Sequence, residues 1–206
     1  MSRGSILRSS SKCLIYLPSS ACGTWNDVPR IQSYSMNMAD DTGKPSLIKI
    51  VDLFDSHGVE YIVVGGQAAV LYGSPIPTYD VDLSYKRTTE NLQRLARALQ
   101  DIRPTLRGAP PDLPFLLDAQ SLALGSNFTF DTAYGPLDLL GWLDPIGGYD
   151  DFASRAEEIQ IEGRSIRLLS LQDLITIKRH IRRPKDQAVL VQLEAIQQLR
   201  ESGEIS

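Results

Sequence analysis

A short strand that ends in two glycines and leads into a helix is the feature that most constrains the fold of this chain. Residues 61–64 are apolar and mostly β-branched, Gly65 and Gly66 follow them, and residues 67–72 have the composition of a short helix. Because glycine has no side chain, a triphosphate can approach the backbone amides and the positive end of a helix at such a point. On its own, however, a double glycine more often marks an ordinary tight turn.

The next expected strand carries two carboxylates on one face. Apolar residues at positions 81, 83 and 85 alternate with Asp80, Asp82 and Ser84, which is the pattern of a half-buried strand. Residues two apart on a strand point to the same side, so Asp80 and Asp82 present two charges that repel each other unless cations neutralise them. Magnesium prefers carboxylate oxygens and is often completed by substrate phosphates. Alone, this strand is better explained as an exposed face, but together with a phosphate-binding turn it suggests metal-assisted phosphoryl or nucleotidyl transfer.

The rest of the chain alternates helical and strand patterns, without an internal repeat. We therefore predict an α/β (α+β) fold, a small mixed sheet flanked by helices, with further helices at the C-terminus. In chain order, the other expected elements are a helix between Ser46 and Gly58, a helix over residues 89–102, a proline-rich loop, strands over residues 127–131 and 137–142, a hairpin around Glu162 and Gly163, a helix from a Ser170–Asp173 capping box to His180, and a helix from Pro184 to about Arg200.

Composition limits the class of protein. The chain has 206 residues, 42% of them hydrophobic and 22% charged, with a net charge of -4, which is typical of a globular protein and excludes a generally basic nucleic-acid coat. Its two cysteines, Cys13 and Cys22, lie near the N-terminus, so the remaining chain has no thiol for a disulfide or a zinc site. No apolar run approaches the roughly 20 residues of a membrane helix. We expect a cytoplasmic protein without a membrane partner.

The first 44 residues predict a disordered leader. They are rich in serine, with scattered arginine, glycine and proline and no sustained period, so they cannot bury enough apolar surface to offset chain entropy. One alternative is a targeting peptide, because basic residues precede a short apolar stretch there. Another is a misannotated start, because Met36 and Met38 lie just before the organised region. The domain itself is expected over residues 45–202.

These motifs together resemble the signature of the nucleotidyltransferase superfamily related to polymerase beta. The segment from Val63 to Gly66 is followed, after thirteen residues, by the segment 80–83 with its two aspartates. The resemblance implies a third acidic residue on a later strand, and Asp138 in the segment 135–140 occupies the matching place. The alternative for Asp138 is an edge-strand surface position, but its leucine neighbours make an unpaired carboxylate costly there, which favours metal ligation. Asp80, Asp82 and Asp138 would then hold two Mg²⁺ ions, with Mn²⁺ as an alternative metal.

The C-terminal region is similar to the closing helices of the bacterial AbiEii-like branch, which includes toxins of toxin and antitoxin pairs. This similarity extends the resemblance over about residues 46–198. Five of the eight residues 178–185 are basic, and Lys178, Arg182 and Lys185 lie near one helical face, where they are predicted to bind phosphate together with the two glycines. The alternative, preferred for Arg179 and Arg183, is a solvated helix end whose cations complement the helix dipole. The residues that carry the similarity are Asp173, Leu174, Lys178, Arg182, Pro184, Lys185 and Asp186.

Two departures from the family pattern stand out. Many relatives have an arginine where this chain has Ile76, which puts one phosphate or acceptor contact in doubt. Much of the superfamily has a serine in place of Gly66, although the AbiEii-like branch tolerates glycine there.

The resemblance implies a metal-dependent nucleotidyltransferase that moves a nucleoside monophosphate from a nucleoside triphosphate to a hydroxyl acceptor. Asp138 would also serve as general base. The acceptor stays open among an RNA end (tRNA included), a protein and a small hydroxylated molecule, and a toxin would add a cognate antitoxin as partner. Two alternatives remain: a non-catalytic nucleotide-binding or antitoxin-like regulatory module with the same fold, and an unrelated α/β domain with chance motifs. Convergence of the three carboxylates within metal-bridging distance would argue against chance.

Overall fold

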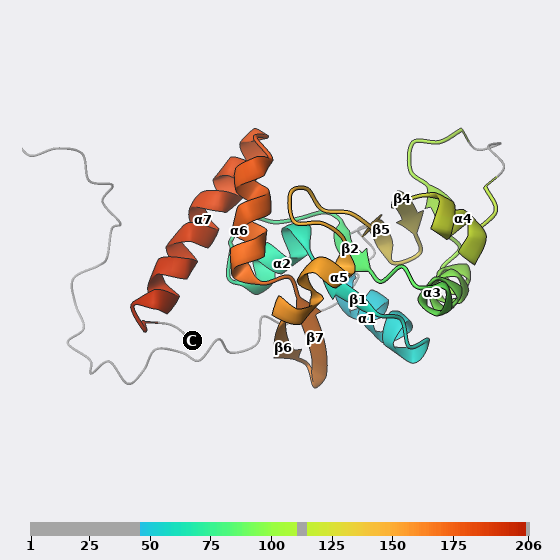
Figure 1. Cartoon of the computed structure of the whole chain (residues 1–206), viewed down its shortest axis with the longest axis horizontal. Coiled ribbons are helices and arrows are strands. Elements are labelled where there is room, and N and C mark those ends of the chain that lie inside the picture. The colour runs from blue at the N-terminus through green and yellow to red at the C-terminus, as the bar shows by residue number, and fades with distance from the viewer. Residues whose placement is uncertain (1–45, 111–114, 205–206) are drawn as a thin grey trace, which may run out of the picture. The chain divides into compact units, whose positions relative to one another are not determined.

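A mixed β-sheet is the centre of the structure, a computed structural model that describes residues 46–110 and 115–204 (Figure 1). Within these residues, seven strands form one sheet in the order β3-β4-β5-β2-β1-β7-β6. The predicted leader, with both cysteines, and residues 111–114 of the predicted proline-rich loop lie outside the described residues. The predicted α/β fold with a mixed sheet and flanking helices is confirmed.

Parallel and antiparallel pairs together build the sheet. The strand β2 runs antiparallel to β1 and parallel to β5, and β1 runs parallel to β7. Antiparallel partners extend the sheet at both ends, so that β3 and β6 are its edges. The strands are β1 (Tyr61–Val63), β2 (Val81–Tyr85), β3 (Thr105–Leu106), β4 (Asn127–Thr132), β5 (Gly135–Leu140), β6 (Glu157–Ile161) and β7 (Arg164–Leu168).

Helices flank this sheet, and Figure 1 shows α6 and α7 side by side and α3 beside α4. The predicted helices all form close to their expected bounds. The short α4 and α5 were not predicted, because one to two turns give no readable apolar period. The helices are α1 (Leu47–Ser56), α2 (Gly65–Leu71), α3 (Thr89–Asp101), α4 (Ala119–Leu124), α5 (Tyr149–Phe152), the 3-10 helix η1 (Ala153–Arg155), α6 (Leu171–His180) and α7 (Pro184–Glu201).

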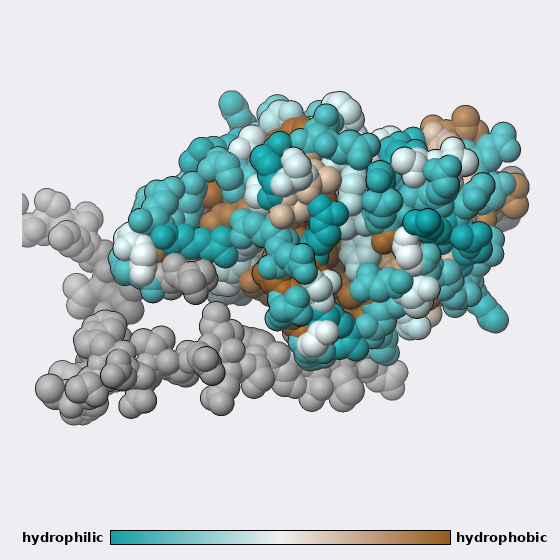
Figure 2. Space-filling view, turned by 60° about the horizontal axis from the view of Figure 1, so that its bottom comes forward, coloured by the Kyte–Doolittle hydropathy of each residue, from teal (hydrophilic) through white to brown (hydrophobic). Residues whose placement is uncertain are grey.

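Side-chain caps mark where α1 and α6 begin, whereas α7 begins at Pro184 without a side-chain cap. The Ser46 hydroxyl accepts a hydrogen bond from the backbone of Lys49, and the Ser170 hydroxyl accepts one from the backbone of Asp173. The Asp173 carboxylate pairs with Arg155 and accepts a hydrogen bond from the Ser170 hydroxyl, in place of the Ser170 backbone amide that a full capping box would use. Apolar faces of the helices then pack on the sheet, while hydrophilic residues cover most of the surface seen in Figure 2. In the described part of the chain, no helix has both the length and the apolar character needed to cross a lipid bilayer.

The strand β2 differs from the prediction in one respect. A half-buried strand was expected, but Ser84 is fully buried, and its hydroxyl has no hydrogen-bond partner among the described residues. The reason is position: β2 lies inside the sheet between β1 and β5, so both faces of its C-terminal half are covered. Only its N-terminal end, with Asp80 and Asp82, stays partly accessible.

Candidate metal centre

Three carboxylates converge at the N-terminal end of β2, one from the residue before β2, one from β2 and one from β5. Asp80, Asp82 and Asp138 each offer one oxygen, and these oxygens lie within 4.8 Å of one another. The parallel register of β2 and β5 causes this convergence, since it sets Asp82 directly beside Asp138. Divalent cations in two-metal sites are themselves about 4 Å apart. The three carboxylates are thus close enough to share divalent cations, which is the arrangement that chance motifs would not be expected to give.

The double glycine and the acidic strand are joined by hydrogen bonds. The Gly66 amide donates to Asp82 Oδ2 at 3.1 Å, and the Thr78 hydroxyl donates to Asp80 Oδ1 at 2.7 Å. The Gln67 side chain also reaches the Asp80 carbonyl oxygen, at 3.4 Å. The first turn of α2 therefore orients the Asp82 carboxylate, whereas Thr78, in the loop before β2, orients that of Asp80.

Both glycines are required by close packing against this strand. Gly65 has a φ of +60°, and a Cβ atom there would lie 2.0 Å from Asp82 Oδ2. A Cβ atom on Gly66 would lie 2.4 Å from the Thr78 hydroxyl. Side chains of the acidic strand thus fill the space that glycine leaves free. This packing also explains why glycine, and not serine, stands at position 66, because a serine would displace the hydroxyl that holds Asp80.

Burial and mutual repulsion disfavour the ionised form of this cluster when no cation is bound. Burial, followed by the charge of Asp80, raises the pKa of Asp82 to about 6, while the Gly66 amide and the more distant Lys178 act in the opposite direction. Burial also raises the pKa of Asp138, against the opposing charge of Arg107. Two of the three carboxyl groups therefore resist ionisation in the metal-free protein.

Arg107 is the site residue that the sequence analysis missed. Its guanidinium lies 3.0 Å from Asp138 Oδ1 and 3.2 Å from Asp131 Oδ1, and it donates to the Phe130 carbonyl oxygen at 2.8 Å. The contact with Asp138 is an ion pair without hydrogen-bond alignment, so Oδ1 stays buried without a hydrogen-bond partner in the described residues. No sequence signal marked this arginine, because β3 is only two residues long and its contacts are made across the sheet.

The predicted basic cluster divides into a buried and an exposed part. Lys178 is buried, and its amine lies 2.5 Å from Asp186 Oδ1 at the contact of α6 with α7. The same carboxylate accepts a hydrogen bond from Arg183. Arg182 and Lys185 are exposed, and neither has an ion-pair partner within residues 46–110 and 115–204. Lys178 is the member of this cluster whose charge acts on Asp82.

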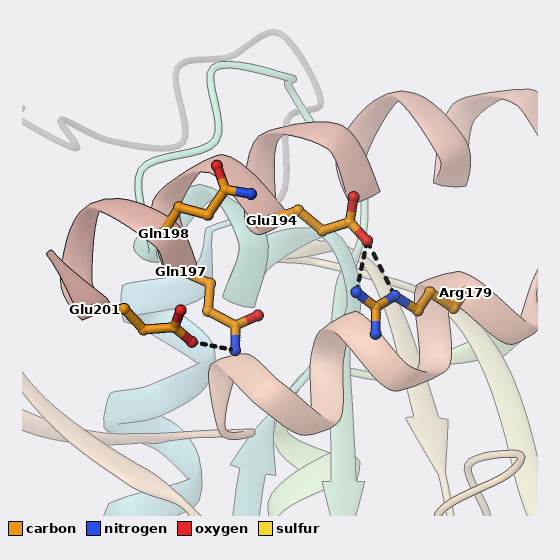
Figure 3. A pocket seen from close by; sticks show the side chains of 5 residues that line it. All are labelled: Arg179, Glu194, Gln197, Gln198 and Glu201. Atoms are coloured by element: carbon orange, nitrogen blue, oxygen red, sulfur yellow. Dashed lines mark hydrogen bonds and ion pairs between the residues drawn. The ribbon is translucent and has the colours of Figure 1, made fainter.

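Two surface hollows lie apart from the three carboxylates. The groove in Figure 3, of about 380 Å³, runs between α6 and α7. Its charged groups already have partners, with Arg179 held by Glu194 at 2.8 and 3.0 Å and Glu201 accepting a hydrogen bond from Gln197. A second hollow, of about 440 Å³, lies beyond the C-terminal end of β5, with Trp142 and Asp150 among its lining residues. Neither hollow is lined by a member of the acidic cluster.

Comparisons with known proteins identify the fold to which this chain is similar. No protein-family model matches the chain, and no curated protein sequence matches it. Among solved structures, it is similar to the lincosamide antibiotic adenylyltransferase LnuA in its lincomycin-bound crystal structure, with a TM-score of 0.50 and 20% identity over 73% of this chain and 95% of that chain. A putative nucleotidyltransferase from Thermotoga maritima has a TM-score of 0.46 and 16% identity, covering 77% of this chain and 90% of its own. ANT(2'')-Ia in complex with adenylyl-2''-tobramycin has a TM-score of 0.45 and 16% identity, covering 75% and 92%. The likeness to LnuA shows that the chain has the nucleotidyltransferase fold predicted from its motifs.

Proposed function

We propose that this protein is a metal-dependent nucleotidyltransferase that moves a nucleoside monophosphate from a nucleoside triphosphate to a hydroxyl acceptor. The observation that carries the proposal is the convergence of Asp80, Asp82 and Asp138 within 4.8 Å. An exposed acidic cluster alone would be weak support. Here the carboxylates are partly buried, two of them have raised pKa values, and each of the three is held by a neighbouring group.

The residues of the cluster fit divalent metal ions. Carboxylate oxygens are the ligands that Mg²⁺ and Mn²⁺ prefer, and cations would offset the burial and the repulsion from Asp80 that raise the pKa of Asp82. We propose that Asp80 and Asp82 hold one Mg²⁺ and that Asp138 shares in holding a second. Bound magnesium would stabilise the charge that develops on the transferred phosphate and lower the pKa of the attacking hydroxyl.

The protein's own groups account for the remaining chemistry. Asp138 takes the proton of the acceptor hydroxyl, whose oxygen then forms a bond to the α-phosphorus. The bond from the α-phosphorus to the bridging oxygen of the β-phosphate breaks, and pyrophosphate leaves. Exposed Arg182 and Lys185 are suited to bind its charge. The Gly66 amide already donates to Asp82. Buried Lys178 contributes through its field at Asp82 in the structure, held in place by Asp186.

The acceptor class is the finer part of the proposal. Similarity in fold to a lincosamide adenylyltransferase favours a small hydroxylated molecule. The resemblance of the C-terminal residues to the AbiEii-like branch supports two other possibilities. One is an RNA end, tRNA included, as the acceptor, and the other is the role of a toxin with a cognate antitoxin. A catalytic role is favoured over a purely nucleotide-binding or antitoxin-like module, because binding alone does not need three carboxylates clustered at an electrostatic cost.

Transfer of label tests this proposal. The full chain is incubated with Mg²⁺ and each α-labelled nucleoside triphosphate, with total RNA, protein extract or a panel of hydroxylated small molecules as acceptors. We expect incorporation into one acceptor class, abolished in Asp80→Asn/Asp82→Asn and retained in Asp101→Asn, which changes an exposed carboxylate on α3. Nucleotide binding without any transfer would refute the enzymatic function and support the binding module instead.

A further inference from the structure

We propose that Arg107 is a positioning residue that fixes the Asp138 carboxylate for metal binding. The inference rests on the proposed function, since it concerns how the third carboxylate of that site is held. It assigns a role to a residue that belongs to neither of the sequence motifs. It also predicts how the metal site responds when that residue changes.

Arg107 is itself held firmly from several directions. Its backbone amide donates to the Thr129 carbonyl oxygen at 2.9 Å, which fixes the start of the side chain on β4. The guanidinium then donates to the Phe130 carbonyl oxygen at 2.8 Å and pairs with Asp131 at 3.2 Å. Three anchors on one strand leave a planar guanidinium little freedom to turn. Its position relative to β5 is therefore set by β4 and does not depend on Asp138 alone.

This fixed cation determines which oxygen of Asp138 is available. Guanidinium Nη2 lies 3.0 Å from Oδ1, and Oδ1 is buried. The Asp138 side chain is nevertheless 16% exposed. Because Oδ1 is the buried oxygen, we infer that a cation would reach Oδ2. Arg107 thus covers one oxygen from behind and leaves the other for the cluster with Asp80 and Asp82.

The same geometry distinguishes a guanidinium that positions the Asp138 carboxylate from one that competes with the metal for it. A guanidinium on the accessible oxygen would have to leave before a metal could bind, and its removal would tighten metal binding. A guanidinium on the inaccessible oxygen does not block the metal, and its removal frees the carboxylate to rotate. Partners that orient metal ligands in this way typically contribute 10- to 100-fold to metal affinity. The sign of the change in affinity therefore distinguishes the two roles.

The test is Mn²⁺ binding to the full chain, followed by electron paramagnetic resonance with and without a non-hydrolysable nucleoside triphosphate. We expect Arg107→Gln to weaken Mn²⁺ binding about 10-fold and Arg107→Lys to weaken it less, because lysine keeps the charge but not the planar fork. Asp138→Asn alone should also weaken Mn²⁺ binding. In that background, adding Arg107→Gln should change the affinity less than about 2-fold, because its target is already gone. Circular dichroism verifies folding, and Arg107→Lys carries the test if the glutamine variant does not fold.

Unchanged or tighter Mn²⁺ binding in both Arg107 variants would overturn the proposal. An equal loss from Arg107→Gln with and without Asp138 would overturn it as well, because that result indicates general structural damage. These outcomes differ from failure of the proposed function. In that case the wild-type protein itself would bind no Mn²⁺, and Asp138→Asn would behave like wild type.

Discussion

Replacing Asp82 by asparagine should stabilise the metal-free protein at pH 7.5. The pKa of this carboxyl group is about 6 in the folded protein, against an ordinary value of 3.8, a difference of about two units. At about 1.4 kcal/mol per unit, ionised Asp82 costs the folded state about 3 kcal/mol. Partial solvent access and the loss of the charge-assisted bond from the Gly66 amide reduce the gain. We therefore expect Asp82→Asn to raise the free energy of unfolding by about 1 to 2 kcal/mol.

The pH dependence gives this prediction its sign. Because the pKa is raised on folding, the folded protein holds the proton more tightly than the unfolded chain does. The cost of Asp82 is absent below the unfolded pKa of 3.8, grows between pH 4 and 6, and is complete above about pH 6. The advantage of Asp82→Asn should accordingly be much smaller at pH 4.5 than at pH 7.5.

Urea unfolding followed by circular dichroism in EDTA measures this effect. Asp101→Asn, on the exposed end of α3, is the matched control and should not reproduce the gain. With Mg²⁺ and a nucleotide analogue present, the wild-type protein should gain stability and Asp82→Asn should not. A less stable Asp82→Asn at pH 7.5, or a gain that is the same at both pH values, would refute the reasoning.

Three further predictions follow from the packing around the site. Ser84→Ala should raise the free energy of unfolding by about 1 kcal/mol in urea titrations, because it removes a buried hydroxyl that lacks a partner; a loss of stability would show that the hydroxyl is satisfied. Gly65→Ala should destabilise the fold and abolish Mn²⁺ binding, whereas Gly163→Ala, with a similar φ of +78° but open space, should show only the backbone cost, so equal effects would contradict the collision. Lys178→Met should lower the free energy of unfolding by about 3 kcal/mol in urea titrations, because it leaves Asp186 buried without its main partner. Adding Asp186→Asn should recover part of the loss, and no recovery would argue against the ion pair.

Local signals explain what the sequence could predict. The order of strand, double glycine, helix and acidic strand depends on neighbouring residues, and its register follows once β2 and β5 pair in parallel. Asp80 and Asp82 could therefore be singled out from the alternation along one strand, whereas Asp138 was singled out by the resemblance to the nucleotidyltransferase superfamily. The fold class was predictable for the same reason, since the long helices have clear caps and apolar periods.

Contacts between distant segments explain what the sequence could not predict. Arg107 joins the cluster through a two-residue edge strand that has no pattern of its own. Lys178 lies in a dense basic run, yet its burial depends on Asp186 of the following helix. Ser84 is covered because of strand order, which alternation along one strand does not reveal. In each case the sequence gives the residue type, and only the fold gives its partner.

The most direct test of the metal centre is a crystal structure of the protein with Mn²⁺ and a non-hydrolysable nucleoside triphosphate, measured for anomalous scattering. The account predicts anomalous peaks among Asp80, Asp82 and Asp138, about 2.1 Å from their carboxylate oxygens, with the triphosphate completing the coordination. A bound nucleotide with no metal between these three carboxylates would contradict it.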